Sequence, residues 1–287
     1  MKKLLTFIFL MECFVNVQGQ NLATGKLEAH AENESMATTI DTTSKITFEV
    51  YGTSFTMIRV DGGTFLMGAT KEQAKSVNAD EKPAHQVTLS TFYIGETTVT
   101  QELWETVMGS NPSKYAGYDK PVDKVSWEDC QVFLKELNKI VGKQFRLPTE
   151  AEWEFAARGG IKSRGYKYSG SNKIKDVAWI DSNTWLAKSK TEDGHSGLGS
   201  RDVKTKQPNE LGIYDMSGNI WEWCQDWYGM YDGNAQTNPG GVSTGKQKVR
   251  RGGSWFNDGR GARVSMRAGS APDKRDESIG FRLALSN

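Results

Sequence analysis

Hydrophobic and polar residues alternate along the chain from Ile46 onward, and this two-residue period is typical of a β-strand. Ile46, Phe48 and Val50 would share one face of the first strand. The turn sequence Asp61-Gly62-Gly63 predicts that the strand after it returns as the hairpin partner of the strand before it. The strands predicted in this way cover residues 46–50, 55–60, 64–67, 86–89 and 92–94.

Three segments have apolar residues at helical spacing, each just after a Ser or Thr whose hydroxyl can cap a helix. Ser126 with Asp129, and Thr149 with Glu152, also have the spacing of a capping box. Gly159-Gly160 predicts the end of the third helix. Residues 163–287 are rich in glycine and turn residues, so we predict a single α+β domain with a high irregular content. The helices are predicted to begin after Thr100, Ser126 and Thr149.

Residues 1–19 have the features of a secretory signal peptide. Lys2 and Lys3 precede a short apolar run, which is too short to span a bilayer, and the small Gly19 precedes Gln20. A lipoprotein with its lipid on Cys13, or a buried N-terminal strand, are the alternatives. Residues 20–45 are polar and lack periodicity, which predicts a flexible leader before a domain at residues 46–287. We therefore expect export to the periplasm, cell surface or medium, with no transmembrane segment.

Charge and cysteine content narrow the classes of function. Lys and Arg number 36 against 35 Asp and Glu, and the resulting net charge of +1 gives no electrostatic basis for binding nucleic acid. The three cysteines are too few for a disulfide-dense scaffold. Cys130 and Cys224 remain after export, either joined by a disulfide or buried as two separate thiols, and the sequence leaves both alternatives open.

Six motifs follow one another in an order that resembles the formylglycine-generating enzyme (sulfatase-modifying factor) family. The resemblance covers about residues 55–285 and implies that family's fold, an α+β variant of the C-type lectin fold. The motifs are Gly62-Gly63-Thr64-Phe65-Leu66-Met67-Gly68, Pro121-Val122-Asp123-Lys124-Val125-Ser126-Trp127, Arg146-Leu147-Pro148-Thr149-Glu150-Ala151-Glu152-Trp153-Glu154, Gly218-Asn219-Ile220-Trp221-Glu222-Trp223, Arg251-Gly252-Gly253-Ser254-Trp255 and Gly280-Phe281-Arg282.

The resemblance also implies which residues would catalyse the family's reaction, and this chain departs from that pattern. The enzymes oxidise a substrate cysteine with copper held by two cysteines, because soft thiolate ligands hold Cu(I). Asn257 and Ala262 stand at the two positions here, so we expect no copper and no formylglycine-generating activity. Related iron enzymes hold iron on clustered histidines, whereas His30, His85 and His195 are isolated in this sequence, so we expect no iron.

A calcium site is the one metal site that the resemblance carries over. In the family, residues in and before the Gly-Asn-x-Trp-Glu-Trp motif surround a Ca²⁺ ion. The matching ligands here are the side chains of Asp215 and Glu222 and the backbone carbonyls of Gly218 and Ile220. Oxygen ligands on a tight turn suit Ca²⁺, while acidic residues in a turn are otherwise commonly solvated.

Residues 256–278 resemble the C-terminal variable region of proteins diversified by retroelements, several of which share the lectin-like fold. Small or polar residues without periodicity lie there between residues that look structural, such as Arg263 and Arg267. An ordinary surface loop is the alternative. The ligand-binding residues predicted from this resemblance are Phe256, Asn257, Asp258, Arg260, Ala268, Gly269 and Ser270.

Two functions are compatible with these observations. The first is an exported, non-catalytic domain that binds an extracellular or cell-surface protein or glycan through its C-terminal loops. The alternative is a divergent oxidoreductase or protein-modifying enzyme of the same family. The missing cysteine pair favours the first, because fold alone does not determine function.

Overall fold

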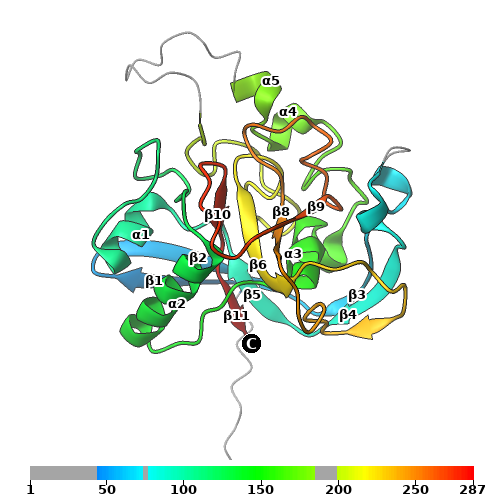
Figure 1. Cartoon of the computed structure of the whole chain (residues 1–287), viewed down its shortest axis with the longest axis horizontal. Helices are drawn as coiled ribbons and strands as arrows, with labels where there is room; N and C mark the ends of the chain where they lie inside the picture. Colours follow the sequence, from blue (N-terminus) through cyan, green and yellow to red (C-terminus); the bar gives the residue numbers. More distant parts are fainter. Residues whose placement is uncertain (1–43, 74–76, 185–198) are drawn as a thin grey trace, which may run out of the picture. The chain divides into compact units, whose positions relative to one another are not determined.

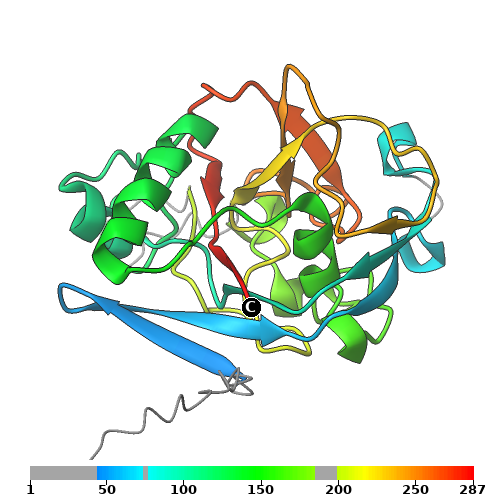
Figure 2. The same ribbon diagram turned by 90° about the horizontal axis from the view of Figure 1, so that it is seen from below.

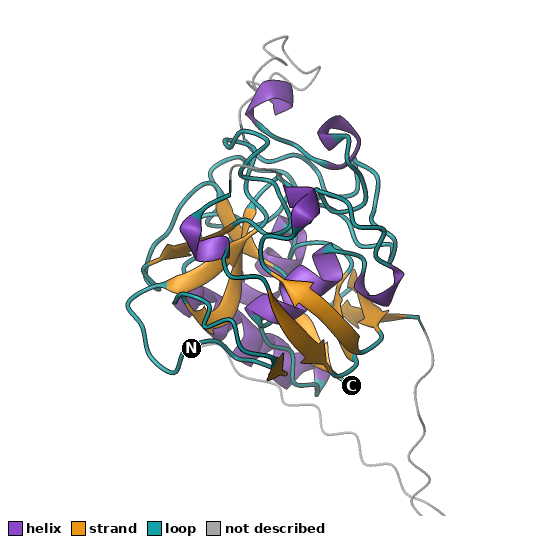
Figure 3. Cartoon of the chain, turned by 90° about the vertical axis from the view of Figure 1, so that its right-hand side faces the viewer, coloured by secondary structure: helices purple, strands orange, loops and turns teal. Residues whose placement is uncertain are grey.

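The computed structural model describes residues 44–73, 77–184 and 199–287, which belong to one unit from Thr42 to Asn287. The predicted signal peptide at residues 1–19 and nearly all of the predicted leader at 20–45 lie outside the described residues. Within the described ranges, no helix is long and apolar enough to cross a membrane. Long loops connect short helices and strands (Figure 3), as the glycine-rich sequence predicted.

Along the described chain, strands β1–β5 come first, helices α1–α5 follow, and strands β6–β11 come last (Figure 1). The strands are β1 (Lys45–Val50), β2 (Thr53–Val60), β3 (Gly63–Met67), β4 (His85–Leu89), β5 (Phe92–Gly95), β6 (Trp221–Trp227), β7 (Gln236–Thr237), β8 (Lys248–Arg251), β9 (Arg267–Ser270), β10 (Ile279–Phe281) and β11 (Ala284–Ser286). The helices are α1 (Gln101–Met108), α2 (Trp127–Val141), α3 (Glu150–Ala157), α4 (Ile174–Val177) and α5 (Asp181–Thr184), with 3₁₀ turns η1 (Lys71–Gln73), η2 (Ala79–Glu81) and η3 (Gly160–Lys162).

The strands of the described chain form three sheets, in the orders β1-β2-β5-β11, β10-β6-β8-β9 and β3-β4-β7. The predicted hairpin between residues 55–60 and 64–67 is wrong, because β2 pairs with β1 and β5 while β3 pairs with β4. A Cβ on Gly62 would lie 2.6 Å from the Leu89 carbonyl oxygen. This glycine therefore lets the chain pass close to the end of β4 and enter a different sheet.

All three predicted helix starts are confirmed. The Thr100 hydroxyl accepts the Leu103 N–H at the start of α1. Ser126 and Asp129 form a reciprocal capping box at α2, and Thr149 and Glu152 form another at α3. These caps satisfy backbone N–H groups that have no partner inside the helix, so the three helices begin where the sequence alone places them.

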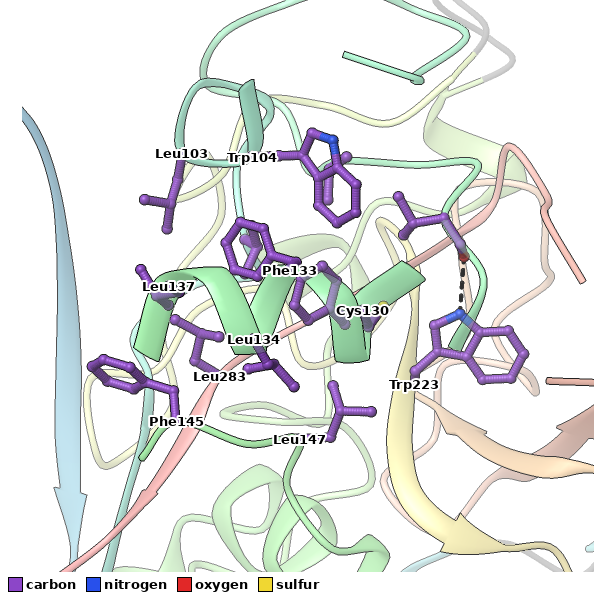
Figure 4. Packing of buried hydrophobic residues seen from close by; sticks show 14 of the residues in the cluster. Leu103, Trp104, Cys130, Phe133, Leu134, Leu137, Phe145, Leu147, Trp223 and Leu283 are labelled. Carbon is purple, nitrogen blue, oxygen red and sulfur yellow. Dashed lines mark hydrogen bonds between the residues drawn. The ribbon is translucent and has the colours of Figure 1, made fainter. Parts of the chain in front are cut away.

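Strand β6 separates two hydrophobic cores. Trp223 packs with α1, α2 and the β1–β2 hairpin, which runs along these two helices in Figure 2. Its indole N–H donates to the Val125 carbonyl oxygen over 3.0 Å, close to Cys130 on α2 (Figure 4). The next residue, Cys224, lies in the second core with Trp153 of α3. Because neighbouring side chains of a strand point to opposite faces, one strand supplies both cores.

Buried ion pairs join α3 to the C-terminal strands. Glu154 pairs with Arg251 of β8, and both side chains are fully buried. Glu150 pairs with Arg267 of β9, with an Oε2–Nη2 distance of 2.5 Å. Both carboxylates leave a helix whose eight residues are all buried, so the charges have no access to bulk water. A buried charge without its partner is costly, and these pairs therefore hold the sheet against the helix.

Removing one member of the Glu154–Arg251 pair tests this role. We expect Glu154→Gln to lower the free energy of unfolding by about 3–5 kcal/mol, because Arg251 then loses the carboxylate that contacts it and keeps only Glu150, whose Oε1 lies 3.6 Å from the Arg251 Nε. Glu136→Gln is the matched control, since Glu136 forms an exposed pair with Lys139 on α2 and should change stability by less than about 1 kcal/mol. Urea denaturation of both variants measures the difference, and equally small losses would contradict the assignment.

Candidate functional site

A hollow of about 520 Å³ opens beside the C-terminal sheet, where the predicted ligand-binding segment begins. Its lining comes from β8, from the loop that follows β8 and from the segment that precedes β10. Strands β8 and β10 lie on either side of β6 (Figure 1), so the sheet brings these distant segments to one place. The side chains used below are those of Lys124, Trp221, Arg250, Trp255, Phe256 and Asn257.

The loop after β8 is held in shape by its own residues. Gly252 and Gly253 have φ values of 94° and 73°, and a Cβ on Gly253 would lie 2.5 Å from the Gly261 carbonyl oxygen. The Asn257 side-chain oxygen accepts the backbone N–H of Ser254 at 3.0 Å and its hydroxyl at 2.9 Å. Asn257 thus supports the turn, and its side-chain oxygen is directed back at the loop.

Ala262 is fully buried in a small third cluster with Tyr168 and Ile180. The cluster leaves no exposed surface at the position where the resemblance implies the second cysteine of the copper site. Asn257 caps a turn at the first position. Both positions therefore have structural roles here, and neither side chain has a thiolate to offer to a metal.

Phe256 is the exposed aromatic residue of the hollow, with 64% of its surface accessible. Its ring lies edge-on to Trp255 with the centroids 5.6 Å apart. Trp255 is buried, and its indole N–H donates to the Glu277 carbonyl oxygen at 3.3 Å. An exposed ring that rests on a fixed, buried ring loses little freedom when it contacts a ligand.

The other five predicted ligand-binding residues do not line this hollow. Asp258 and Arg260 form an exposed ion pair with each other at 2.8 Å. Ala268, Gly269 and Ser270 belong to β9, where they are half-buried and paired with β8. The structure therefore brings Phe256 and Asn257 together and places the rest elsewhere, because the β8–β9 ladder fixes the later residues.

Arg250 and Trp221 were not among the residues predicted for this site. The Arg250 guanidinium lies 4.6 Å above the Trp221 ring centre. The neighbouring Arg251 is fully buried and paired with Glu154. Two adjacent arginines on a strand must face opposite sides, and that alternation was the signal available in the sequence.

The first predicted calcium ligand has an unsatisfied oxygen. Asp215 is 3% exposed, and one of its carboxylate oxygens accepts the Lys204 N–H at 2.9 Å. The other oxygen, Oδ1, is buried and has no hydrogen-bond partner. Burial raises the pKa of Asp215 to about 6.

The second predicted calcium ligand is engaged elsewhere. Both carboxylate oxygens of Glu222 accept from the Arg282 guanidinium at 2.6 Å, and one also accepts the Trp153 indole N–H at 2.7 Å. No three His, Cys, Asp or Glu side chains gather into a metal cluster within the part of the chain that is described. Of the two predicted side-chain ligands, only Asp215 therefore has an oxygen without a partner, and a cation there would have to share Glu222 with Arg282.

Cys130 and Cys224 are free thiols in the structure, so the disulfide alternative is not realised. They lie in the two different hydrophobic cores on opposite sides of β6. Burial raises the pKa of both thiols well above the ordinary value, which disfavours the reactive thiolate. They contribute to packing as small apolar side chains.

Comparison with known proteins agrees with the architecture. The profile of the "Sulfatase-modifying factor enzyme 1-like domain" matches residues 47–287. The chain is 34% identical to the chaperone protein LppX of Paenibacillus barcinonensis, covering 73% of this chain and 81% of LppX. It is 30% identical to the formylglycine-generating enzyme of Streptomyces coelicolor, and the match covers 79% of this chain and 88% of that enzyme. The structure of Treponema denticola variable protein 1 superposes on this chain with a TM-score of 0.75 and 31% sequence identity. The match covers 86% of this chain and 100% of the variable protein. The predicted fold and both resemblances are confirmed.

Calcium binding at Asp215 stays a prediction that melting experiments can test. The raised pKa means that ionising Asp215 destabilises the fold as the pH rises from about 4 through about 6, and a bound cation would reverse that loss. We expect Ca²⁺ to raise the melting temperature relative to EDTA, more at about pH 7.5 than at about pH 5. Asp215→Ala should abolish the shift.

Asp226→Ala is the control, because Asp226 is also a buried carboxylate with a raised pKa but is not among the predicted calcium ligands. It should lower the melting temperature and keep the response to Ca²⁺. Equal melting temperatures of the wild-type protein in EDTA and Ca²⁺ would contradict the site.

Proposed function

This chain belongs to the sulfatase-modifying factor enzyme 1-like family, and from that premise we propose that it is an exported, non-catalytic binding domain. Its ligand would be an extracellular or cell-surface protein or glycan. The ligand would occupy the hollow lined by Phe256. Export rests on the sequence of residues 1–19, which has the composition of a signal peptide.

One observation carries the proposal. Asn257, at the first of the two positions where the resemblance implies copper-binding cysteines, lines the hollow but caps a turn, while Ala262, at the second, is buried outside the lining. What remains is a concave surface with one exposed aromatic ring and a buried support beneath it. Such a surface suits recognition, because aromatic anchors beside a pocket contribute strongly to binding.

Family membership by itself does not choose between binding and catalysis. The relatives reported above bear names as different as chaperone, enzyme and variable protein. The function therefore has to be argued from the residues at the site. A divergent oxidoreductase or protein-modifying enzyme is the alternative, and it would need a reactive group that replaces the missing thiolates.

The alternative is tested by a direct assay. We expect the purified protein, supplied with Cu(I), oxygen and a sulfatase-type cysteine peptide, to leave the peptide mass unchanged, because no thiol lines the hollow. Mass spectrometry detects the loss of the thiol and the gain of an aldehyde. The Streptomyces coelicolor enzyme serves as the positive control, and an aldehyde product with the present chain would overturn the non-catalytic proposal.

The binding proposal is tested by removing the exposed ring. Labelled protein is applied to a panel of immobilised glycans and extracellular protein domains, and every ligand that binds is titrated. Phe256→Ala should weaken binding by about thirtyfold or more, as expected for an aromatic hot spot, while the melting temperature stays within about 2 °C.

The matched control is Tyr51→Ala, because Tyr51 is an exposed aromatic residue on the β1–β2 turn and does not line the hollow. It should leave every affinity unchanged. If Phe256→Ala keeps full affinity for each ligand of the panel, the hollow is not the binding surface.

A further inference from the structure

Arg250 differs from the other arginines of the C-terminal sheet. Arg251, Arg267 and Arg282 each pair with a buried glutamate. The side chain of Arg250 has no hydrogen bond or ion pair with a described residue, and its buried Nε atom has no partner. Its guanidinium lies on the Trp221 ring and borders the hollow. A guanidinium has five N–H donors in a planar fork, so the hollow contains unused donors.

The other charged groups around the hollow mostly have partners. Arg275 makes a bidentate pair with Asp129 at 2.7 Å. Glu277 pairs with Lys114, and Asp276 accepts the Ser278 hydroxyl at 2.7 Å. Among the described residues that line the hollow, Arg250 therefore supplies positive charge that no nearby carboxylate neutralises at contact distance.

Lys124 adds a second cation at the rim. Its side chain is exposed and has no ion-pair partner among the described residues. Arg250 is the stronger candidate for direct contact, because its planar guanidinium can donate two parallel hydrogen bonds to a carboxylate. Lys124 would contribute a more distant, salt-sensitive attraction.

We propose that Arg250 binds a carboxylate of a peptide ligand, with the apolar side chain next to that carboxylate packed on the exposed ring of Phe256. This assignment rests on the binding function proposed above and names the ligand class of the same hollow. The peptide carboxylate would supply the acceptor that Arg250 lacks in the free protein. The Phe256 ring, which rests on the buried Trp255, would cover the apolar part of the same ligand.

A peptide fits these walls better than a polyanionic glycan does. The hollow has one stacked guanidinium and one exposed aromatic ring, that of Phe256, which suit a single carboxylate beside an apolar group. Asp276 and Glu277 stand on the same wall and repel any anion, so they disfavour the repeated negative charges of a sulfated or uronic-acid glycan more than a single carboxylate.

In the absence of a ligand, the Arg250 side chain should make the wild-type protein less stable than a variant that lacks the guanidinium. Partial burial removes water from the guanidinium without replacing all of its hydrogen bonds, and it lowers the pKa of Arg250. Arg250→Met keeps an unbranched side chain over Trp221 but removes the charge. We therefore expect this variant to have a higher melting temperature than the wild type, whereas a purely structural arginine would lower it when removed.

The test uses the full chain and two probes that differ only in charge: N-acetylphenylalanine and its amide. Binding is followed by tryptophan fluorescence and calorimetry. We expect wild-type protein to bind the carboxylate about tenfold or more tightly than the amide, as a charge-assisted bidentate contact predicts. Arg250→Met should reduce this preference to about one. Arg260→Met is the control, because Arg260 is exposed, paired with Asp258 and outside the lining, and it should keep the preference.

Three results would overturn the assignment. The first is equal or undetectable binding of the two probes to the wild type. The second is a carboxylate preference that survives in Arg250→Met. The third is tighter binding of N-acetylneuraminic acid or a heparin disaccharide than of N-acetylphenylalanine, which would replace the peptide with an acidic glycan. If Phe256→Ala still weakens panel binding in the first two cases, the binding function stands and only the role of Arg250 fails.

Discussion

The buried pairing of arginine with glutamate is the interaction on which the rest of the fold depends. Two glutamates of α3, Glu150 and Glu154, meet arginines of β9 and β8 in the interior. Glu222 of β6 meets Arg282 after β10. A charge in a low-dielectric interior must find its partner, so these pairs specify which segments come together even though the elements themselves are short. The long connecting loops therefore begin and end at elements that these ion pairs hold in place.

These ion pairs also support the irregular loop that forms the proposed binding surface. The segment after β8 is closed by glycine conformations at Gly252 and Gly253 and by the Asn257 cap. It is followed by Arg263, whose guanidinium is buried against Glu81 with 2.6 Å contacts. Exposed residues between Gly253 and Arg263, such as Phe256, can be substituted without altering these structural contacts. A rigid scaffold that carries variable loops is a common arrangement for recognition.

The alternation of side chains along a strand decides the role of several neighbouring residues. Trp223 and Cys224 enter different cores, which keeps Cys224 away from Cys130 and leaves both thiols free. Arg251 enters the interior and stabilises the sheet, while Arg250 reaches the hollow. Two neighbouring residues of the same type thus have different surroundings, because their side chains point to opposite faces of the strand.

Some features of this protein are set by residues close together in the sequence, and others by residues far apart. The sequence by itself determined the three helix starts, since a cap such as Thr149 with Glu152 is made within four residues. Its motifs also identified the family, and Asn257 and Ala262 marked the missing cysteines. Only the tertiary structure decided that β3 leaves β2 for β4, and that the unpaired Arg250 borders the hollow. Strand partners and charge partners lie far apart in the sequence, so they are set by long-range packing that no local pattern records.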